Sequence, residues 1–383
     1  MDAVSPQFSS GGSRAPAKVG MSVDEVDTPA LLLDLAAFER NLAWLPASLR
    51  GAPIRVRPHG KSHKCPEIAR RQIAHGAVGV CCQKVSEAEV FVAGGIADVL
   101  VTNEVVGTQK LERLAQLAQR ARLGVCVDDL ANVGDLGRAM GRARSAIDVY
   151  VELNVGADRC GVEPGEAAVA LVRALTRHPG LRFAGLQAYQ GRAQHLRTPE
   201  QRAEAIGLAV EKIRRTIAAL GAHGVPVPIV TGAGTGTYLL ESGSSVYHEI
   251  QPGSYIFMDA DYGRNLDPAG RPISDFQQSL YLLTTVMSHP TPDRAVVDAG
   301  LKAHATDSGM PLVHGLPGAT YLKAADEHGV VTLSESATVR LGQKLRLIPG
   351  HCDPTVNLHD WLIGFRDDVV ETVWPIAGRG AFY

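Results

Sequence analysis

The chain has 383 residues, with 38 Lys and Arg against 40 Asp and Glu, so its net charge is −2 at neutral pH. A charge this close to zero gives no sign of a nucleic-acid or membrane partner, and we expect neither. Hydrophobic residues make up 45% and charged residues 20% of the chain, which is typical of a globular protein. The length exceeds what one hydrophobic core usually organises, so we expect two domains.

The six cysteines predict a reducing, cytoplasmic setting. None stands in a CxxC pair, and the adjacent Cys81 and Cys82 would point to opposite faces of a strand. A disulfide framework or a zinc ribbon is therefore not expected. Residues 1–20 are rich in Ser, Gly, Ala and Pro and predict a disordered tail rather than a signal peptide. No apolar run reaches the eighteen or so residues of a membrane helix.

The predicted elements begin with a buried strand at 30–35, followed by a helix that carries Phe38, Leu42 and Leu45 at helical spacing. From there an apolar strand recurs, each strand ends in a polar or glycine-rich loop, and a helical pattern usually follows. These strands are expected at 55–57, 77–82, 96–101, 124–127, 147–153, 183–187, 227–230 and 249–251. The rhythm predicts a parallel (β/α)8 barrel over residues 30–270, with a doubly wound open sheet as the alternative.

Beyond about Pro272 the pattern changes to short strands separated by turns, with the strands expected at 280–287, 295–299, 320–322, 330–333, 344–348, 361–365 and 369–374. This change predicts a separate all-β domain over residues 271–383, which the segment at about 21–29 is expected to join. In a barrel the loops that follow the strands converge on one rim. Polar residues at these strand ends are therefore expected to share one site.

A basic stretch from Arg57 to Lys64 follows the strand at 55–57 and has the sequence RPHGKSHK. Crowding by His59 and His63 is expected to favour the neutral amine of Lys61, because a charged neighbour disfavours a second positive charge. A neutral lysine can form a Schiff base with a carbonyl compound. The alternative is an ordinary basic loop on the surface.

Two glycine-rich loops follow late strands of the predicted barrel, at 231–236 and 253–255. Small residues let backbone N–H groups point at an anion, and Thr235 adds a hydroxyl. The spacing is not that of a dinucleotide fingerprint. Each loop alone could be a plain turn, but late barrel loops commonly hold a phosphate. Together with Lys61 they favour pyridoxal phosphate as the cofactor.

His351 and Asp353 follow the strand at 344–348 and would point the same way in an extended segment. One imidazole nitrogen and one carboxylate oxygen suit Mn²⁺, Mg²⁺, Co²⁺ or Zn²⁺. The alternative is a surface turn with an incidental histidine. His195, in the loop that follows Tyr189, would lie on the same rim as Lys61 and is a candidate general base.

Seven motifs in order resemble the D-threonine aldolase and D-3-hydroxyaspartate aldolase family, from about Val26 to the C-terminus. They are RPHGKSHK at 57–64, CCQKVSEA at 81–88, RCG at 159–161, QAY at 187–189, GTG at 234–236, QPGSY at 251–255 and HCDP at 351–354. Members of this family are similar in fold to the barrel of alanine racemase, with a C-terminal β domain, and they need a divalent metal.

The resemblance implies a role for each residue that the motifs carry. Lys61 would hold the cofactor, His351 and Asp353 the metal, and His195 would be the base. The residues implied around the cofactor ring or its phosphate are Gln83, Arg159, Tyr189, Thr235, Gly236, Gly253, Ser254 and Tyr255.

The implied reaction is the retro-aldol cleavage of a D-3-hydroxy-amino acid, D-threonine or D-3-hydroxyaspartate, to glycine and an aldehyde, by a homodimer. A dehydratase that releases a keto acid and ammonia is the alternative. Related dehydratases tend to place Cys where this chain has Asp353, which weakens that alternative. A non-catalytic cofactor carrier would not need the metal pair. For hydroxyaspartate, Lys302 or His304 could pair with the second carboxylate, unless Lys302 forms only a surface salt bridge.

Overall fold

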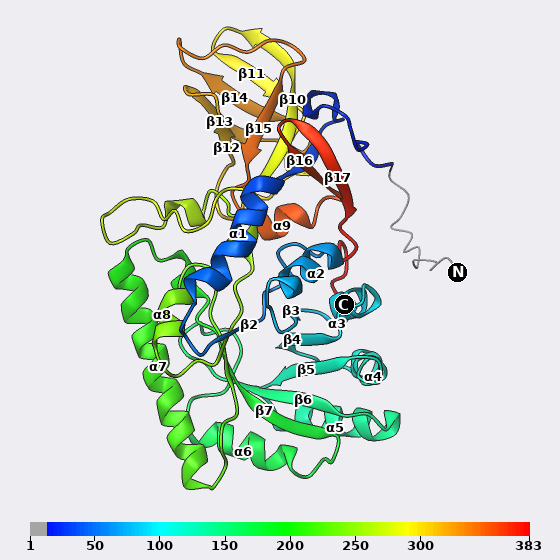
Figure 1. Ribbon diagram of the computed structural model, residues 1–383, viewed down its shortest axis with the longest axis vertical. Coiled ribbons are helices and arrows are strands. Elements are labelled where there is room, and N and C mark those ends of the chain that lie inside the picture. The colour runs from blue at the N-terminus through cyan, green and yellow to red at the C-terminus, as the bar shows by residue number, and fades with distance from the viewer. Residues whose placement is uncertain (1–13) are drawn as a thin grey trace.

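The computed structural model describes residues 14–383, which form two bodies, each built around one sheet (Figure 1). Residues 1–13 of the tail predicted at 1–20 lie outside the described residues. Within residues 14–20, Ala17 is buried and the N–H of Gly20 donates to the carbonyl of Val370. Within the described part of the chain, every helix is too short or too polar to cross a lipid bilayer.

The first body is a curled sheet of eight parallel strands, which confirms the predicted barrel rather than an open doubly wound sheet. The strand order is β2-β9-β8-β7-β6-β5-β4-β3. A parallel bridge between His59 and Cys81 joins the chain after β2 to β3 and brings the two ends of this order together. The strands are β2 (Arg55–Val56), β3 (Val80–Cys82), β4 (Asp98–Glu104), β5 (Arg122–Val127), β6 (Ile147–Glu152), β7 (Leu181–Ala188), β8 (Val230–Gly232) and β9 (Glu249–Ile250).

Helices follow the barrel strands and cover the outside of the sheet (Figure 1). Their starts are marked in the sequence: Asp129 accepts from two backbone N–H groups at the start of α5, and Thr198 and Gln201 form a capping box at the start of α7. The helices of this part of the chain are α1 (Leu35–Ser48), α2 (Pro66–Ala74), α3 (Val85–Ala93), α4 (Thr108–Leu117), α5 (Leu130–Ala143), α6 (Glu166–Leu175), α7 (Pro199–Ala222) and α8 (Tyr238–Gly243).

The second body is built on a nine-stranded mixed sheet whose main order is β13-β14-β11-β10-β1-β16-β17; β15 also pairs with β10 and with β12. Apart from β1, its strands all follow the barrel in sequence. They are β1 (Ala30–Asp34), β10 (Leu280–Thr291), β11 (Arg294–Val297), β12 (Leu312–His314), β13 (Ala319–Ala324), β14 (Gly329–Leu333), β15 (Lys344–Ile348), β16 (Trp361–Arg366) and β17 (Val369–Pro375).

The strand β1 lies inside this second sheet, antiparallel to β10 and parallel to β16, although the predicted barrel began at residue 30. Its apolar run is buried on both faces. Leu31 and Leu33 belong to the core that contains Phe38 of α1, whereas Ala30 and Leu32 pack with Ile363 on the other side. A strand that is buried on both faces has no polar alternation, which is why a barrel strand and this strand look alike in sequence.

The segment after β15 differs from the extended geometry that we expected. Residues Cys352–Val356 form a short helix, α9, which His351 precedes. Pro354 favours an extended reading in sequence. In the first turn of a helix, however, the missing N–H of proline costs no hydrogen bond. In Figure 1, α9 lies between the second sheet and the barrel.

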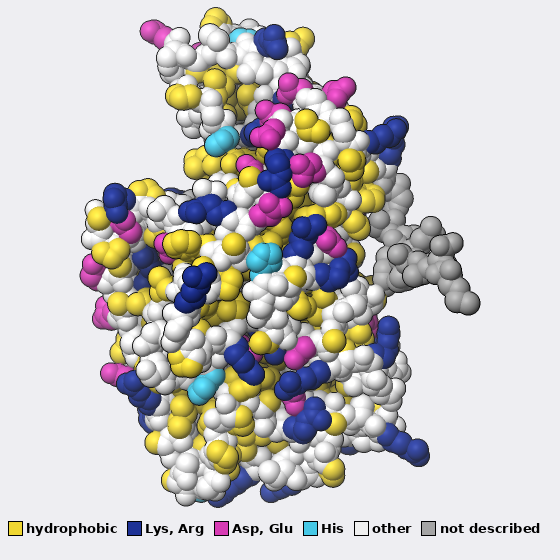
Figure 2. Space-filling model, in the orientation of Figure 1, with side chains coloured by type: hydrophobic (Ala, Val, Ile, Leu, Met, Phe, Trp, Pro, Cys, Tyr) yellow, Lys and Arg dark blue, Asp and Glu magenta, His cyan; other side chains and the backbone are white. Residues whose placement is uncertain are grey.

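On the face shown in Figure 2, basic and acidic side chains are interspersed over both bodies rather than gathered in one patch of a single sign. All six cysteines are free, and five of them are buried. The second body also contributes to the rim where the barrel strands end, because His351 and Asp353 at the start of α9 line the same cavity as the barrel loops.

Candidate active site

Lys61 stands in a tight turn between β2 and α2. The N–H of Gly60 donates to the carbonyl of Cys81, and the N–H of Lys64 donates to the carbonyl of Gly60, both at 2.7 Å. A β-carbon at Gly60 would lie 2.4 Å from the ring of Phe91, so only glycine fits this approach of the turn to α3. The turn is thus fixed on both sides of Lys61, at the carboxyl end of the barrel strands.

A cavity of about 240 Å³ lies at this rim and brings most of the predicted site residues together. Lys61, His195, His351 and Asp353 all line it. The predicted cofactor residues that line it are Gln83, Arg159, Tyr189, Thr235, Gly253 and Ser254. Other lining residues, to which the sequence assigned no role, are Thr102, Gln187, Gln251 and Tyr262, although Gln187 and Gln251 stand in the motifs QAY and QPGSY.

Two predicted cofactor residues do not line the cavity. The N–H of Gly236 donates to Oε1 of Gln194, so this group is already used within the protein. The Tyr255 side chain is buried in the apolar core, where its hydroxyl accepts a hydrogen bond from Gln72 at 3.2 Å. Neighbouring residues of a tight turn point in different directions, so the motif that contains Ser254 does not place Tyr255 in the same site.

The ionisation of Lys61 differs from the expectation drawn from its neighbours in sequence. Burial opposes the charge on the amine, but the carboxylate of Asp353, whose Oδ2 lies 3.5 Å from Nζ, raises the pKa of Lys61 above its usual range. His59 and His63 add little positive charge, because burial keeps the pKa of His59 well below its usual value and lowers that of His63 to about 4. A residue distant in sequence therefore outweighs the adjacent histidines.

The imidazole of His195 is held by the carboxylate of Asp261, which contacts its Nδ1. Its Nδ1 lies 2.5 Å from Oδ2 of Asp261, and its ring packs against Tyr262 with centroids 5.7 Å apart. Asp261 also accepts from Arg197 and Arg264. Burial opposes the ionisation of Asp261, but Arg197 and His195 lower its pKa. An ionised carboxylate only accepts, so Nδ1 of His195 carries a proton, and in the neutral imidazole the lone pair is on Nε2.

The loops after β8 and β9 fit the phosphate of a pyridoxal cofactor. The hydroxyl oxygen of Thr235 is buried and has no hydrogen-bond partner among residues 14–383, although it belongs to a residue that lines the cavity. A buried polar atom without a partner is costly, which points to a ligand that accepts or donates there. Gly253 approaches the Lys61 turn so closely that a β-carbon would lie 2.6 Å from Oγ of Ser62.

The donor set of His351 and Asp353 fits a divalent ion. Lys61 and His351 lower the pKa of Asp353 to about 2 against the effect of burial, so its carboxylate is ionised at neutral pH. Nδ1 of His351 lies 2.7 Å from Oδ2 of Asp307, which leaves the other ring nitrogen for a ligand in the cavity. An imidazole nitrogen with a carboxylate oxygen is a donor pair typical of Mn²⁺ or Zn²⁺.

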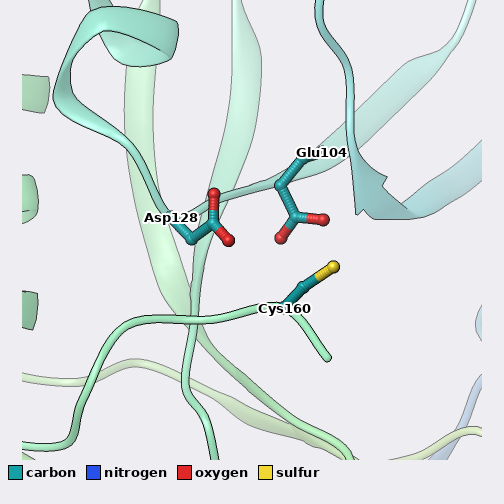
Figure 3. Close-up of side chains that lie close together, drawn as sticks. All are labelled: Glu104, Asp128 and Cys160. Atoms are coloured by element: carbon teal, nitrogen blue, oxygen red, sulfur yellow. The ribbon is translucent and has the colours of Figure 1, made fainter. Parts of the chain in front are cut away.

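A second group of acidic side chains lies near Arg159, and the sequence did not predict it. Figure 3 shows Glu104, Asp128 and Cys160 pointing toward one another, with donor atoms within 4.8 Å of each other. Glu152 adjoins this group, at 4.0 Å from Arg159. Burial and Glu104 raise the pKa of Glu152 to about 8, so its carboxyl group is protonated at neutral pH. Only the fold brings these strand ends together.

Neither residue suggested for a second substrate carboxylate lines the cavity. Lys302 forms an exposed ion pair with Glu327, which is the surface salt bridge that stood as its alternative. His304 is fully buried, and its Nε2 lies 2.9 Å from the hydroxyl of Tyr321. Both residues follow β11 in sequence; Lys302 lies on the outer surface of the second body, and His304 lies in its interior.

A parallel barrel with a lysine at the strand ends, closed over by a second β body, defines the alanine-racemase-like class of pyridoxal-phosphate enzymes. Residues 33–261 match the model of the alanine racemase N-terminal domain, and residues 279–365 match that of a putative serine dehydratase domain. An alanine racemase from Bacillus anthracis shares the fold at 15% identity, with a TM-score of 0.70 over 91% of this chain and 97% of that one.

Within this class, the chain belongs to the family of D-threonine and 3-hydroxy-D-aspartate aldolases. It is 47% identical to a 3-hydroxy-D-aspartate aldolase of Paracoccus denitrificans over 97% of each chain. It is 49% identical to a D-threonine aldolase of Arthrobacter over 95% of this chain and 96% of that one. The crystal structure of D-threonine aldolase from Filomicrobium marinum superposes with a TM-score of 0.94 at 50% identity, covering 97% and 100% of the chains.

A D-threo-3-hydroxyaspartate dehydratase of Delftia is more distant, at 29% identity over 86% of this chain and 92% of that one. The aldolase relatives therefore favour the family prediction over its dehydratase alternative.

Proposed function

We propose that this protein cleaves D-3-hydroxy-amino acids, D-threonine or D-3-hydroxyaspartate, to glycine and acetaldehyde or glyoxylate. The observation that carries the proposal is the position of Asp353, whose carboxylate lies 3.5 Å from the amine of Lys61 in a cavity that His195 and His351 also line. An amine for a carbonyl cofactor, a donor pair for a cation and a histidine base thus surround one space.

The barrel would hold pyridoxal phosphate, and the second body would supply His351 and Asp353 for the ion. Lys61 provides the amine that binds the cofactor, and the Thr235 hydroxyl and the Ser254 turn receive its phosphate. When bound, the cofactor withdraws electrons from the substrate Cα and the ion polarises the 3-hydroxyl group. We take Mn²⁺ or Mg²⁺ as the ion, with Co²⁺ and Zn²⁺ as alternatives.

His195 acts as the base in this proposal. Because Asp261 holds the proton on Nδ1, Nε2 of His195 can take the proton of the substrate 3-hydroxyl. The Cα–Cβ bond then breaks, the carbonyl product leaves, and a proton returned to Cα gives glycine, which the amine of Lys61 displaces. Protons and electrons balance without any outside oxidant or reductant.

We also propose that the protein is a homodimer, as the family resemblance implies. We propose a cytoplasmic location, which the six free cysteines support. The boundaries of the two domains stay a prediction, with β1 assigned to the second body by its pairing.

A product assay tests the proposal. The purified protein, loaded with pyridoxal phosphate and Mn²⁺, is incubated with D-threonine, D-3-hydroxyaspartate and L-threonine. Glycine, aldehyde, keto acid and ammonia are then measured. We expect glycine and an aldehyde in equal amounts from one or both D-substrates, little product from L-threonine, and loss of turnover with a chelator. Lys61→Ala should lose both turnover and the visible absorbance of the lysine-bound cofactor.

Ammonia with a keto acid would establish the dehydratase reaction instead. Cofactor absorbance without any turnover of the D-substrates would reduce the protein to a cofactor carrier, and full turnover after the metal is removed would refute the role of His351 and Asp353.

A further inference from the structure

The contact between His351 and Asp307 bridges two segments of the second body. Asp307 lies in the loop between β11 and β12, and its Oδ2 is 2.7 Å from Nδ1 of His351. Asp307 does not line the cavity, whereas His351 does. The carboxylate therefore contacts the imidazole from outside the cavity that Asp353 and Lys61 line.

The loop that carries Asp307 is held in place from both of its flanks. The N–H of Ala305 donates to Oγ1 of Thr355, a residue of α9 whose hydroxyl in turn donates to the carbonyl of His351 at 2.7 Å. Arg264 donates to the carbonyl of Ser308 at 2.6 Å. These bonds hold the backbone on each side of Asp307. The Asp307 carboxylate is therefore held in place, unlike that of an incidental ion pair on a surface loop.

Close packing also fixes His351 itself relative to this loop. A β-carbon at Gly350 would lie 2.0 Å from the carbonyl oxygen of Gly309, so the two backbones touch where only glycine fits. On the other side, the N–H of Cys352 donates to the buried carboxylate of Asp259 at 2.9 Å. The backbone of His351 thus has little freedom, and the orientation of its ring depends on the bond at Nδ1.

We infer that Asp307 is the positioning residue of the metal histidine: its carboxylate accepts the Nδ1–H of His351 and thereby presents Nε2, with its lone pair, toward Asp353. The inference rests on the proposed function, since it needs a metal at His351. A neutral imidazole has two tautomers, and a carboxylate acceptor selects one of them. Partners of this kind typically change metal affinity by 10–100-fold.

The first measurement is the dissociation constant of Mn²⁺ for the cofactor-loaded, metal-free protein. We expect Asp307→Ala to raise this constant by about 10–100-fold. Asp307→Asn should raise it less, because the amide oxygen can still accept the bond. The matched control is Glu327→Gln, which removes an exposed carboxylate of the same body and leaves His351 untouched; it should change neither Mn²⁺ affinity nor cofactor absorbance.

The second measurement reads the tautomer directly, by ¹⁵N NMR of the histidines in the metal-free protein, with the signal of His351 assigned from its loss in His351→Gln. Burial opposes the charge on His351, but Asp353 and Asp307 raise its pKa, so the spectra are recorded at alkaline pH, where the imidazole is neutral. We expect the proton on Nδ1 in the wild type and a mixture of tautomers, or mainly the Nε2–H form, in Asp307→Ala. A loss of folding in either Asp307 variant would show in the other histidine signals.

An unchanged His351 tautomer together with Mn²⁺ affinity within twofold of the wild type would overturn the positioning role. Mn²⁺ binding that survives unchanged in His351→Gln would be a different result, because it would remove the metal site from the proposed function and the role of Asp307 with it.

Discussion

The Lys61 amine shows how a single residue depends on parts of the chain that are distant in sequence. Its neighbours in sequence are basic, but the group that decides its charge is the carboxylate of Asp353, contributed by the other body. Loops after parallel strands converge on one rim, and this rule correctly predicted that six residues would line one cavity: Gln83, Arg159, Tyr189, Thr235, Gly253 and Ser254. It could not place Tyr255, because the direction of a side chain in a tight turn is set by packing. The roles of these residues as ligands stay predictions.

The buried carboxyl of Glu152 predicts a measurable pH dependence of stability. Burial, and next the charge of Glu104, raise its pKa to about 8 in the folded protein. The folded state therefore binds this proton more tightly than the unfolded state, and stability is lost as the pH rises from the usual carboxyl range toward 8.

We expect Glu104→Gln to lower the pKa of Glu152 and to reduce this loss, by about 1.4 kcal/mol for each unit of pKa. The measurement is the thermal unfolding midpoint at pH 5, 7 and 9, where the variant should gain on the wild type as the pH rises. Glu112→Gln, at an exposed helix pair with Arg142, serves as the control. Parallel pH curves for Glu104→Gln and the wild type would contradict the expectation.

At the scale of elements, the sequence predicted the barrel strands and the strands after residue 280 within a few residues, but it missed β12 and α9. Both are short, and α9 begins with the residues that were expected to be extended. A helix of one turn has no periodic apolar face to detect, so only its contacts identify it. The consequence for the site is that the metal pair stands on a helix start rather than on a strand.

The start of α1 depends on Asp34, which closes β1 and accepts the N–H of Ala37 at 3.0 Å. We expect Asp34→Ala to lower the free energy of unfolding by about 1 kcal/mol, the usual cost of losing such a cap. Asp34→Asn keeps an oxygen that can accept this bond and should cost only a small part of that. Urea unfolding of the three proteins makes the comparison, and equal losses in both variants would show that charge rather than capping is responsible.

The two bodies depend on each other through β1 at the scale of the whole molecule. Leu31 is fully buried in the core that also holds Phe38 of α1 and Leu282 of β10. We expect Leu31→Ala to destabilise the protein by about 2–5 kcal/mol, as large-to-small changes in a core do. Leu341→Ala, at a residue that is 70% exposed, should change stability by less than about 0.5 kcal/mol.

The measurement is the urea midpoint of unfolding, followed both by far-ultraviolet circular dichroism and by cofactor absorbance. Because β1 leads directly into α1, we expect both signals to shift together in Leu31→Ala. A shift in the circular dichroism signal alone would show that the cofactor site does not depend on this strand.

The place of β1 also determines the order in which a ribosome can build this fold. Ala30–Asp34 leaves the ribosome before any strand of the barrel, yet its pairing partners begin only at Leu280 and Trp361. All the barrel strands are made in between. During that interval the nascent chain carries an apolar strand with two unpaired edges, a segment prone to association with other chains. Chaperone capture of nascent chains should therefore centre on this strand until the last strands of the second body emerge.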